Sequence, residues 1–250
     1  MNELFTRKER AALFSFFPNA RSALLLSGLQ GHLGRAFQSD SGRSALVVVQ
    51  DFIFLAGEAD AVFLREAENA FSNRFLTFSG EKAWLETAKQ WGASLSMIRY
   101  AMETPAQFHK DRLRALAQPP AGYAIVPADE ALYEACRLER WSADLVSAFP
   151  TAPAFSRHGL AVLALKAGRP AAGCGAYAYA DGLLEVEIDT HPAFRRQGLA
   201  TACGAAFILS CLERGLAPHW DAMTAVSLAL AQKLGFGATR PYAVVCREGE

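Results

Sequence analysis

The sequence predicts a mixed α/β (α+β) fold in two parts, and three observations lead to this prediction. Apolar runs with β-type composition alternate with helical patterns along the whole chain. A segment rich in Pro and Gly, 118–122, interrupts this alternation and is typical of a linker. Beyond it, an alternating strand leads through a glycine-containing turn into a long apolar helix. We therefore expect a smaller α/β N-terminal domain, 1–118, without an assigned role, and a second domain, 119–250.

Composition limits the classes of partner. The chain has 250 residues, 52% of them hydrophobic, which is enough to fill a sizeable core. Acidic and basic side chains balance at 25 each, so no overall field favours nucleic acid or an anionic membrane. We therefore expect partners to be recognised through local features of the surface.

The spacing of the cysteines and histidines argues against a set of disulfide bonds and against a metal site. The five cysteines are odd in number and form no C-x-x-C pair, and the five histidines lack the spacing of metal ligands. Buried packing is the expected role of Cys203 and Cys211. The charged N-terminus is not typical of a signal peptide, and the longest apolar run, 45–57, is too short to span a membrane. We expect a cytoplasmic protein without a metal or a membrane segment.

Before the linker, the pattern predicts strands at 44–49, 52–56, 75–78 and 95–101, with helices at 59–71 and 81–91. The glycines of 28–34 predict a loop that enters a helix, because their spacing does not match a dinucleotide fingerprint. After the linker we expect strands at 123–127, 159–166, 171–180, 183–190, 216–220 and 242–247, and helices at 129–139, 142–149, 198–214 and 224–234. The two halves differ in this pattern, and no internal repeat is apparent.

The strand 183–190 carries the first candidate groups. Leu184, Val186 and Ile188 alternate with three acidic residues, so three carboxylates share one face. Those acidic residues are Glu185, Glu187 and Asp189. A solvated outer face of an edge strand would have the same pattern. The segment that follows favours a functional interpretation.

That segment, 191–201, has the composition of a pyrophosphate-binding turn. Gly198 and its small neighbours let backbone N–H groups surround an anion, and the helix that begins there adds the positive end of its dipole. Arg195 and Arg196 supply charged donors. The alternative is that Gly198 only eases entry into the helix and that both arginines are surface residues.

These residues resemble a known family. The pattern Arg195-x-x-Gly198-x-Ala200, after an acidic strand and at the start of a helix, is similar to the acetyl-coenzyme A signature of the GNAT superfamily of N-acetyltransferases. The ending Leu234-Gly235-Phe236 after a helix is common in that superfamily. The stretch 218–222, Pro-His-Trp-Asp-Ala, resembles a bacterial branch that includes proteins related to zwittermicin A resistance. The resemblance is strong over 142–242 and loose before residue 95.

The resemblance implies a mixed sheet, flanked by helices, that splays between two central strands, with the pantetheine arm of acetyl-CoA in the gap. It implies that the backbone of 196–201 holds the pyrophosphate and that the strand end lines the pantetheine. The cofactor-binding positions so implied are Ile188, Asp189, Thr190, Arg195, Arg196, Gln197, Gly198, Leu199, Ala200, Thr201, Thr224 and Ser227.

Two positions depart from the superfamily pattern. Thr224 stands where many members have an asparagine that touches the cofactor, and Ala231 stands where many have a tyrosine that protonates the leaving thiolate. Ser227, one turn before Ala231, is a candidate for that catalytic position, and Tyr242 or a water molecule is the alternative.

The reaction needs a base, because an amine must lose a proton to become an amide. Glu185 and Glu187 are the candidates, with a slight preference for Glu185, and two close carboxylates would raise the pKa of one of them. We therefore expect an acetyltransferase, monomeric or homodimeric, that uses acetyl-CoA and a small-molecule amine by direct attack. We expect the N-terminal part to supply a wall of the acceptor site or a dimer surface. The alternative is a CoA-binding or sensor module that has lost catalysis.

Overall fold

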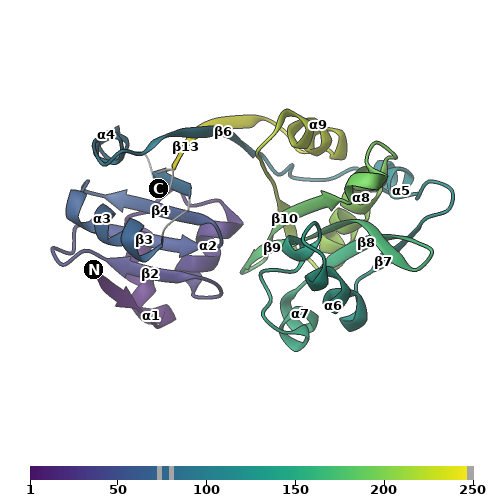
Figure 1. The fold of residues 1–250 in the computed structure, drawn as a ribbon, viewed down its shortest axis with the longest axis horizontal. Coiled ribbons are helices and arrows are strands. Elements are labelled where there is room, and N and C mark those ends of the chain that lie inside the picture. The colour runs from purple at the N-terminus through teal and green to yellow at the C-terminus, as the bar shows by residue number, and fades with distance from the viewer. Residues whose placement is uncertain (72–74, 79–81, 247–250) are drawn as a thin grey trace. The chain divides into compact units, whose positions relative to one another are not determined.

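A computed structural model describes residues 1–71, 75–78 and 82–246, and the chain forms two compact units (Figure 1). Unit 1 comprises Met1–Tyr100 and Pro241–Glu250, and unit 2 comprises Ala101–Arg240. The expected linker, 118–122, lies inside unit 2, so these bounds differ from the predicted boundary at 118/119. The C-terminal segment belongs with the N-terminal part of the chain.

Unit 1 is built on an antiparallel sheet that ends in one parallel pair. Its strands stand in the order β1-β2-β3-β4-β5, antiparallel up to β4 and parallel between β4 and β5, and β13 then pairs antiparallel with β5. The elements are β1 (Asn2–Leu4), α1 (Arg7–Arg10), η1 (Ala11–Ser15), α2 (Ala23–Gln30), β2 (Arg35–Gln38), β3 (Ser44–Val49), β4 (Phe52–Gly57), α3 (Ala61–Ala70), β5 (Phe75–Phe78), α4 (Lys82–Gln90) and β6 (Ser94–Met102).

The core of unit 1 forms where α3 and α4 pack on this sheet. Every residue of β3 is buried, as expected for its unbroken apolar run, and Trp84 of α4 is fully buried among sheet residues such as Leu46 and Ile53. The indole N–H of Trp84 donates to the carbonyl oxygen of Gly57 at 2.9 Å, which satisfies its polar atom. The predicted strands 44–49 and 75–78 are confirmed, and residue 81, the predicted start of a helix, lies outside the described residues.

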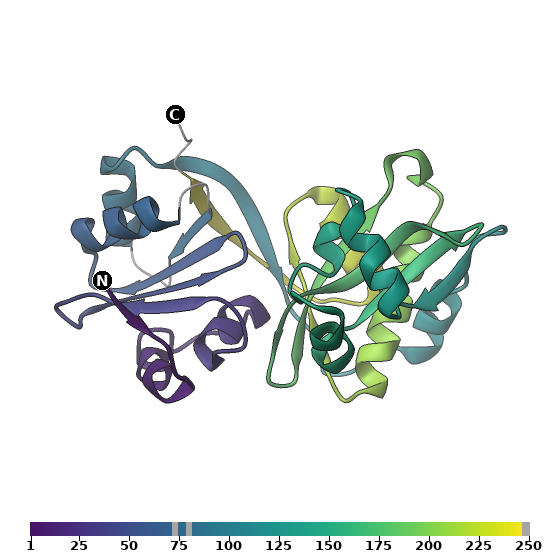
Figure 2. The ribbon, with the colours of Figure 1, turned by 60° about the horizontal axis from the view of Figure 1, so that its bottom comes forward.

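Unit 2 has a five-stranded sheet in the order β7-β8-β9-β10-β11, antiparallel up to β10 and parallel between β10 and β11. Helix α8 lies on one face, whereas α6, α7 and η2 lie on the other (Figure 2). The elements are α5 (Lys110–Leu116), β7 (Ala124–Pro127), α6 (Glu130–Leu138), η2 (Ala143–Leu145), α7 (Ala152–His158), β8 (Ala161–Lys166), β9 (Arg169–Ala180), β10 (Leu183–Thr190), η3 (Pro192–Phe194), α8 (Leu199–Glu213), β11 (Ala217–His219), β12 (Asp221–Ala222) and α9 (Ala225–Leu234). The last strand, β13 (Thr239–Cys246), begins in unit 2 and continues into unit 1.

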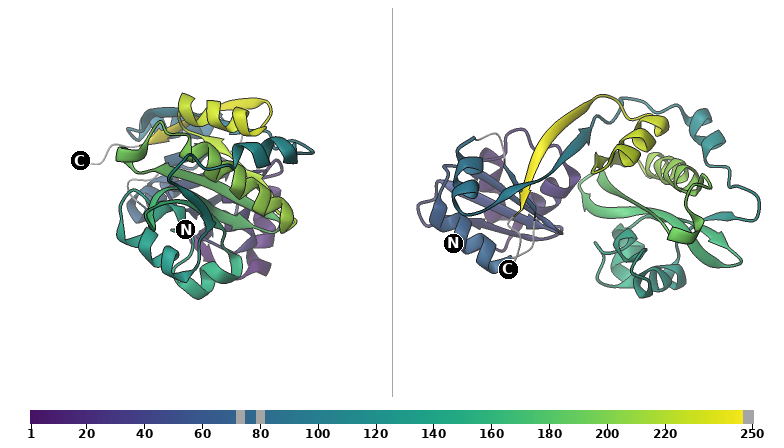
Figure 3. Two further views of the ribbon diagram at one scale, coloured as in Figure 1. Left: turned by 90° about the vertical axis from the view of Figure 1, so that its right-hand side faces the viewer. Right: turned by 45° about the horizontal axis from the view of Figure 1, so that its top comes forward.

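The two units repeat one order of elements, which corrects the expectation that the halves are organised differently. Each has an edge strand, helical segments, three antiparallel strands, a helix, a parallel strand and another helix. The repeat is hidden in the sequence because β1 and β2 are only 3 and 4 residues long and were not predicted. The chain passes between the units through β6 and β13. These two strands are neighbours in the eight-stranded sheet β1-β2-β3-β4-β5-β13-β6-β12 (Figure 3).

The predicted helix 142–149 is wrong. Only Ala143–Leu145 forms a 3-10 turn, and the helix α7 begins later, where the Thr151 hydroxyl caps it by accepting from the Ala154 N–H at 3.3 Å. The backbone of this turn packs directly on β9. A Cβ atom at Gly175 would lie 2.0 Å from the carbonyl oxygen of Leu145, so the glycine permits that approach.

The prediction for 28–34 is also wrong, because α2 ends there and leads into β2. Gly31 adopts φ +76° at the C-cap, which is the ordinary helix end for glycine. The buried guanidinium of Arg10 then donates to the carbonyl oxygens of Leu4, Gly28 and Gly34 at 3.0, 2.8 and 3.2 Å. The glycine spacing at 28–34, which predicted the start of a helix, therefore marks the end of α2 and the turn after it.

Candidate functional site

The candidate site lies in unit 2, where strands β10 and β11 diverge. The parallel pairing joins Leu183–Glu185 to Ala217–His219 and then stops, whereas β10 continues to Thr190 with β9 as its partner. A β-bulge between Glu185 and Val186 marks the same point. The edge of β10 from Val186 onward therefore separates from β11, which is the splay that the family resemblance implied.

The alternation along β10 separates an apolar face from an acidic face, as predicted. Ile188 lies against α8, where a Cβ atom at Gly204 would meet it at 3.3 Å. Leu184, on the same face, is buried. Asp189 is on the opposite face, where the negative charge of Asp144 from η2 acts on it. The acidic face is thus turned toward η2 and is not a simple solvated edge.

Glu185 is buried and hydrogen-bonded to His219. Its side chain is 6% exposed and that of His219 is 12% exposed, and Oε2 of Glu185 lies 2.8 Å from Nδ1 of His219. The second carboxylate oxygen, Oε1, is buried without a hydrogen-bond partner among the described residues. Sequence reasoning missed His219, because its neighbour Glu185 is far away in sequence and only the β10–β11 register brings the two side chains together.

The charge of Glu185 changes the titration of His219. Burial alone would lower the pKa of this imidazole, but the charge and hydrogen bond of Glu185, together with the charge of Asp221, outweigh burial and raise the pKa. Arg240 acts in the opposite direction. The surroundings of His219 therefore favour the protonated imidazole more than water does.

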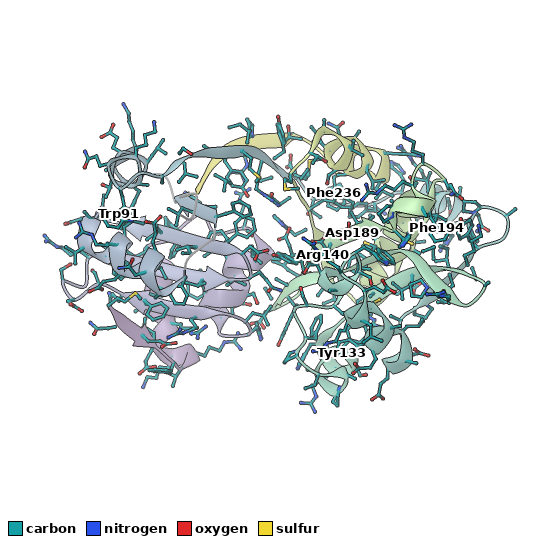
Figure 4. The ribbon with its side chains drawn as sticks, in the orientation of Figure 1. Trp91, Tyr133, Arg140, Asp189, Phe194 and Phe236 are labelled. Atoms are coloured by element: carbon teal, nitrogen blue, oxygen red, sulfur yellow. The ribbon has the colours of Figure 1, made fainter. Side chains whose placement is uncertain are left out.

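Asp189 and Glu187 complete the acidic face. Burial and the charge of Asp144 raise the pKa of Asp189 to about 6, although Arg195 opposes this shift. Asp189 lies near the end of β10, and Phe194 lies beyond it in the segment that leads to α8 (Figure 4). Glu187 is half-buried, and its Oε1 accepts a hydrogen bond from the Ile188 N–H at 3.2 Å.

The turn after β10 leaves the start of α8 open. Arg196 and Gly198 adopt positive φ angles of 62° and 82°, and Gly198 is the N-cap without a side-chain hydrogen bond. A Cβ atom at Gly198 would meet nothing within 4 Å. The first turn of α8 therefore has no side-chain cap at Gly198 that would compete with a bound phosphate. Arg195 and Arg196 are exposed beside them.

Contacts from neighbouring strands hold this turn in place. The Tyr123 hydroxyl donates to Oε1 of Gln197 at 2.7 Å, and its ring meets Phe194 edge to face. The ammonium of Lys166 lies 5.5 Å from the Tyr123 ring centroid and 5.2 Å from that of Phe194. At the helix start, Nζ of Lys233 donates to the Thr201 hydroxyl at 3.5 Å.

Thr224 and Ser227 make hydrogen bonds within the protein at the start of α9. Thr224 caps α9 by accepting from the Ser227 N–H at 3.1 Å, and the Ser227 hydroxyl accepts from the indole N–H of the buried Trp220 at 3.1 Å. Ala231 is fully buried one turn later. Their roles toward a cofactor or a leaving group stay predictions.

Cys136, Cys174, Cys203 and Cys211 are buried, which confirms the packing role expected for Cys203 and Cys211. Burial raises the pKa of the thiols of Cys203 and Cys211 to about 12, so they stay protonated. Within residues 1–71, 75–78 and 82–246, no group of three or more His, Cys, Asp or Glu residues is arranged to hold a metal ion. Over these ranges, no helix combines the length and apolar character that crossing a bilayer requires.

Comparison with known proteins decides the family. A family model described as GNAT acetyltransferase matches residues 14–245. The chain belongs to the GNAT acetyltransferase family. The match extends over both units, so the GNAT family assignment is not limited to the second half of the chain.

Solved structures agree with this assignment. A GCN5-related N-acetyltransferase-like protein from Streptococcus suis 89/1591 is 32% identical, with a TM-score of 0.87 over 96% of this GNAT chain and 99% of the other. A GCN5-related N-acetyltransferase from Kribbella flavida is 20% identical, with a TM-score of 0.64 over 93% and 97% of the two chains. A tandem GNAT protein from the clavulanic acid biosynthesis pathway is 15% identical, with a TM-score of 0.56 over 100% and 98% of the two chains. The last two show the fold alone.

Among curated proteins, an uncharacterized N-acetyltransferase of Bacillus subtilis (strain 168), YdfB, is 27% identical over 185 residues. The alignment covers 69% of this chain and 66% of YdfB, slightly less than two thirds of the relative's length. The similarity supports the family, and the acceptor is a separate question.

Proposed function

We propose that this GNAT protein transfers an acetyl group from acetyl-CoA to the amine of a small molecule. The observation that carries the proposal is the open start of α8 at Gly198, next to the place where β10 and β11 diverge. Membership of an acetyltransferase family supports an acyl transfer reaction, and this helix start fits the pyrophosphate of the donor.

The backbone N–H groups of 196–201 would hold the pyrophosphate, and the side chains of Arg195 and Arg196 would add charged contacts. The free edge of β10 at Ile188, Asp189 and Thr190 would line the pantetheine arm. Acetyl-CoA, when bound, supplies an activated thioester carbonyl. The remaining chemistry belongs to the residues of the acidic face.

The acidic face favours an amine acceptor. Glu187 and Asp189 are half-buried carboxylates that attract a protonated amine, and a base on this face then accepts the proton that the amine must lose. Direct attack needs no covalent acyl-enzyme, which agrees with the inert character of the buried thiols. The relation to zwittermicin A resistance proteins, the monomeric or homodimeric state and the cytoplasmic location stay proposals that rest on the sequence.

A CoA-binding sensor is the second candidate, because Ala231 is fully buried where many GNAT proteins have a tyrosine. A sensor would bind acetyl-CoA without turnover. The leaving thiol of CoA is acidic enough to depart without that tyrosine, so we favour the enzyme.

The test measures thiol release from acetyl-CoA against a panel of amino acids, polyamines and amine-bearing antibiotics. We expect turnover with at least one amine, and we expect Gly198→Glu to lower acetyl-CoA affinity by on the order of 100-fold or more, because its carboxylate occupies and repels the phosphate position.

Gly215→Glu is the matched control. Gly215 also has a positive φ, +69°, and open space around its Cβ position, but it follows the other end of α8. The control separates the strain of a side chain at positive φ from the loss of the phosphate site. Undiminished acetyl-CoA affinity in Gly198→Glu would show that the turn at Gly198 does not bind the pyrophosphate. Binding of acetyl-CoA without turnover of any amine in the panel would favour the sensor.

A further inference from the structure

The pair of Glu185 and His219 has the arrangement of a base held by a buried carboxylate. A carboxylate oxygen accepts hydrogen bonds and does not donate them, so the proton shared at 2.8 Å belongs to Nδ1 of His219. In the neutral ring the other nitrogen, Nε2, then carries the lone pair. Within the described part of the chain, Glu185 is the hydrogen-bond partner of this ring.

The pair of Glu185 and His219 also lies at the point where β10 and β11 separate. Glu185 and His219 are register partners at the last parallel pair before β10 and β11 separate. The strand bulge follows Glu185 directly, and the carboxylates of Glu187 and Asp189 continue along the same face. The proposed donor would lie along β10, so the pair stands where β10 begins to separate from β11.

His219 is the more exposed side chain of this buried pair. The carboxylate of Glu185 is 6% exposed, and its free oxygen Oε1 is enclosed, whereas the imidazole is 12% exposed. Because its carboxylate is enclosed, Glu185 is better placed to orient the imidazole than to contact an amine substrate. A buried carboxylate that fixes the tautomer and orientation of an imidazole is the arrangement by which histidine acts as a general base.

We propose, on the basis of the acetyltransferase function proposed above, that His219 is the general base of this enzyme and that Glu185 is the positioning residue that holds it. In the reaction, the amine nitrogen bonds to the acetyl carbon of the thioester and the carbon–sulfur bond breaks. The proton lost by the amine moves to Nε2 of His219, while Nδ1–H stays bonded to Glu185. His219 then passes this proton to the thiolate, directly or by way of solvent, which leaves the amide, CoA and the neutral enzyme.

The charges around His219 suit this role. The groups that act on it are Glu185 on β10, Asp221 on β12 and Arg240 on β13. Glu185 and Asp221 stabilise the imidazolium that forms when the amine loses its proton, and Arg240 limits that effect. A general base needs an accessible lone pair and sufficient basicity, and the two carboxylates increase the basicity of the imidazole.

The experiment compares wild type with His219→Asn, using acetyl-CoA and the amine of the panel that gives the fastest thiol release. The asparagine amide nitrogen stands near the position of Nδ1 and keeps a donor to Glu185, but it cannot accept a proton. We expect kcat to fall by roughly 100-fold or more with the KM for acetyl-CoA little changed. The ionisation of the amine affects both enzymes equally and cancels in their rate ratio.

The pH profile separates catalysis from a structural role. We expect kcat/KM of wild type to rise with pH and level off once His219 is neutral, whereas His219→Asn should lack this inflection. Glu185→Gln should shift the inflection to lower pH, because the charge that raises the pKa of His219 is gone. NMR titration of the His219 ring in the free enzyme should show the same shift. His109→Asn, at an exposed histidine at the start of α5, is the matched control and should leave the profile unchanged.

An unchanged pH profile in His219→Asn, with thiol release intact, would overturn the assignment of the base and leave the acetyltransferase proposal standing. Loss of the inflection in Glu187→Gln instead would have the same consequence and would move the role to Glu187. Absence of thiol release by wild type with every amine would overturn the proposed function together with this assignment.

Discussion

At the scale of single residues, the acidic strand contains carboxylates with different surroundings. Glu185 is enclosed and paired with a histidine, Glu187 accepts from its own backbone neighbour, and Asp189 faces another carboxylate. The alternation of the sequence predicted the shared face but not these differences. They depend on His219 and Asp144, which reach the strand only through the β10–β11 register and through η2.

Asp189 gives a prediction about stability and pH. Its pKa rises from 3.8 to about 6 in the folded protein, so folding favours its protonated form, and its contribution to stability is lost as the pH rises through this range. The full shift corresponds to roughly 3 kcal/mol, and partial solvent screening reduces the expected effect to about 1 kcal/mol. We expect Asp189→Asn to be more stable than wild type by about that amount at pH 7.5 and equal to it at pH 3.5.

Urea unfolding at the two pH values measures this difference. Asp111→Asn is the control, because the Asp111 side chain is 97% exposed and pairs with Arg114, so removal of its charge should not stabilise the protein. A stability difference that is the same at both pH values would mean that Asp189 is not destabilised by its charge.

At the scale of elements, glycines determine how close the segments of unit 2 approach. Gly198 opens the start of α8, and Gly175 lets η2 lie on β9 and bring Asp144 toward Asp189. The sequence predicted the strand, turn and helix at 183–214 because periodicity and glycine placement are local signals. It failed at 142–149, where backbone packing on Gly175 determines the conformation and no local pattern records it.

Substitution of Gly175 by alanine, which adds one methyl group, tests the close approach of η2 to β9. A Cβ atom there would meet the Leu145 carbonyl oxygen at 2.0 Å, and because that atom is backbone the segment must move. We expect Gly175→Ala to lower the free energy of unfolding by about 2 to 3 kcal/mol in urea titrations. Gly237→Ala, whose nearest atom lies at 3.5 Å, should cost much less. Equal stability of the two variants would show that η2 does not pack on β9 as described.

At the scale of the whole molecule, the two units of this GNAT chain repeat one order of elements, but they differ at the helix start that we propose binds the donor. In unit 1 the equivalent helix is α3, and the carboxylate of Asp60 caps it by accepting from Val62 and Phe63 at 2.9 and 3.0 Å. A bound phosphate would compete with this carboxylate and be repelled by it. In unit 2 the N-cap is Gly198, which has no side chain to compete.

The repeat could not be predicted from the sequence, because its first strands are short and its helix starts carry different residues. The role of unit 1 as a wall of the acceptor site or a dimer surface stays a prediction. The caps, in contrast, give a definite expectation, namely that the donor binds to unit 2 and not to unit 1.

The most direct test is a calorimetric titration of the full chain with acetyl-CoA. We predict saturable binding with one site per chain, because only one of the two equivalent helix starts is open to phosphate. Absence of binding would contradict the central claim that this chain uses acetyl-CoA, and two equal sites per chain would contradict the assignment of the donor to unit 2.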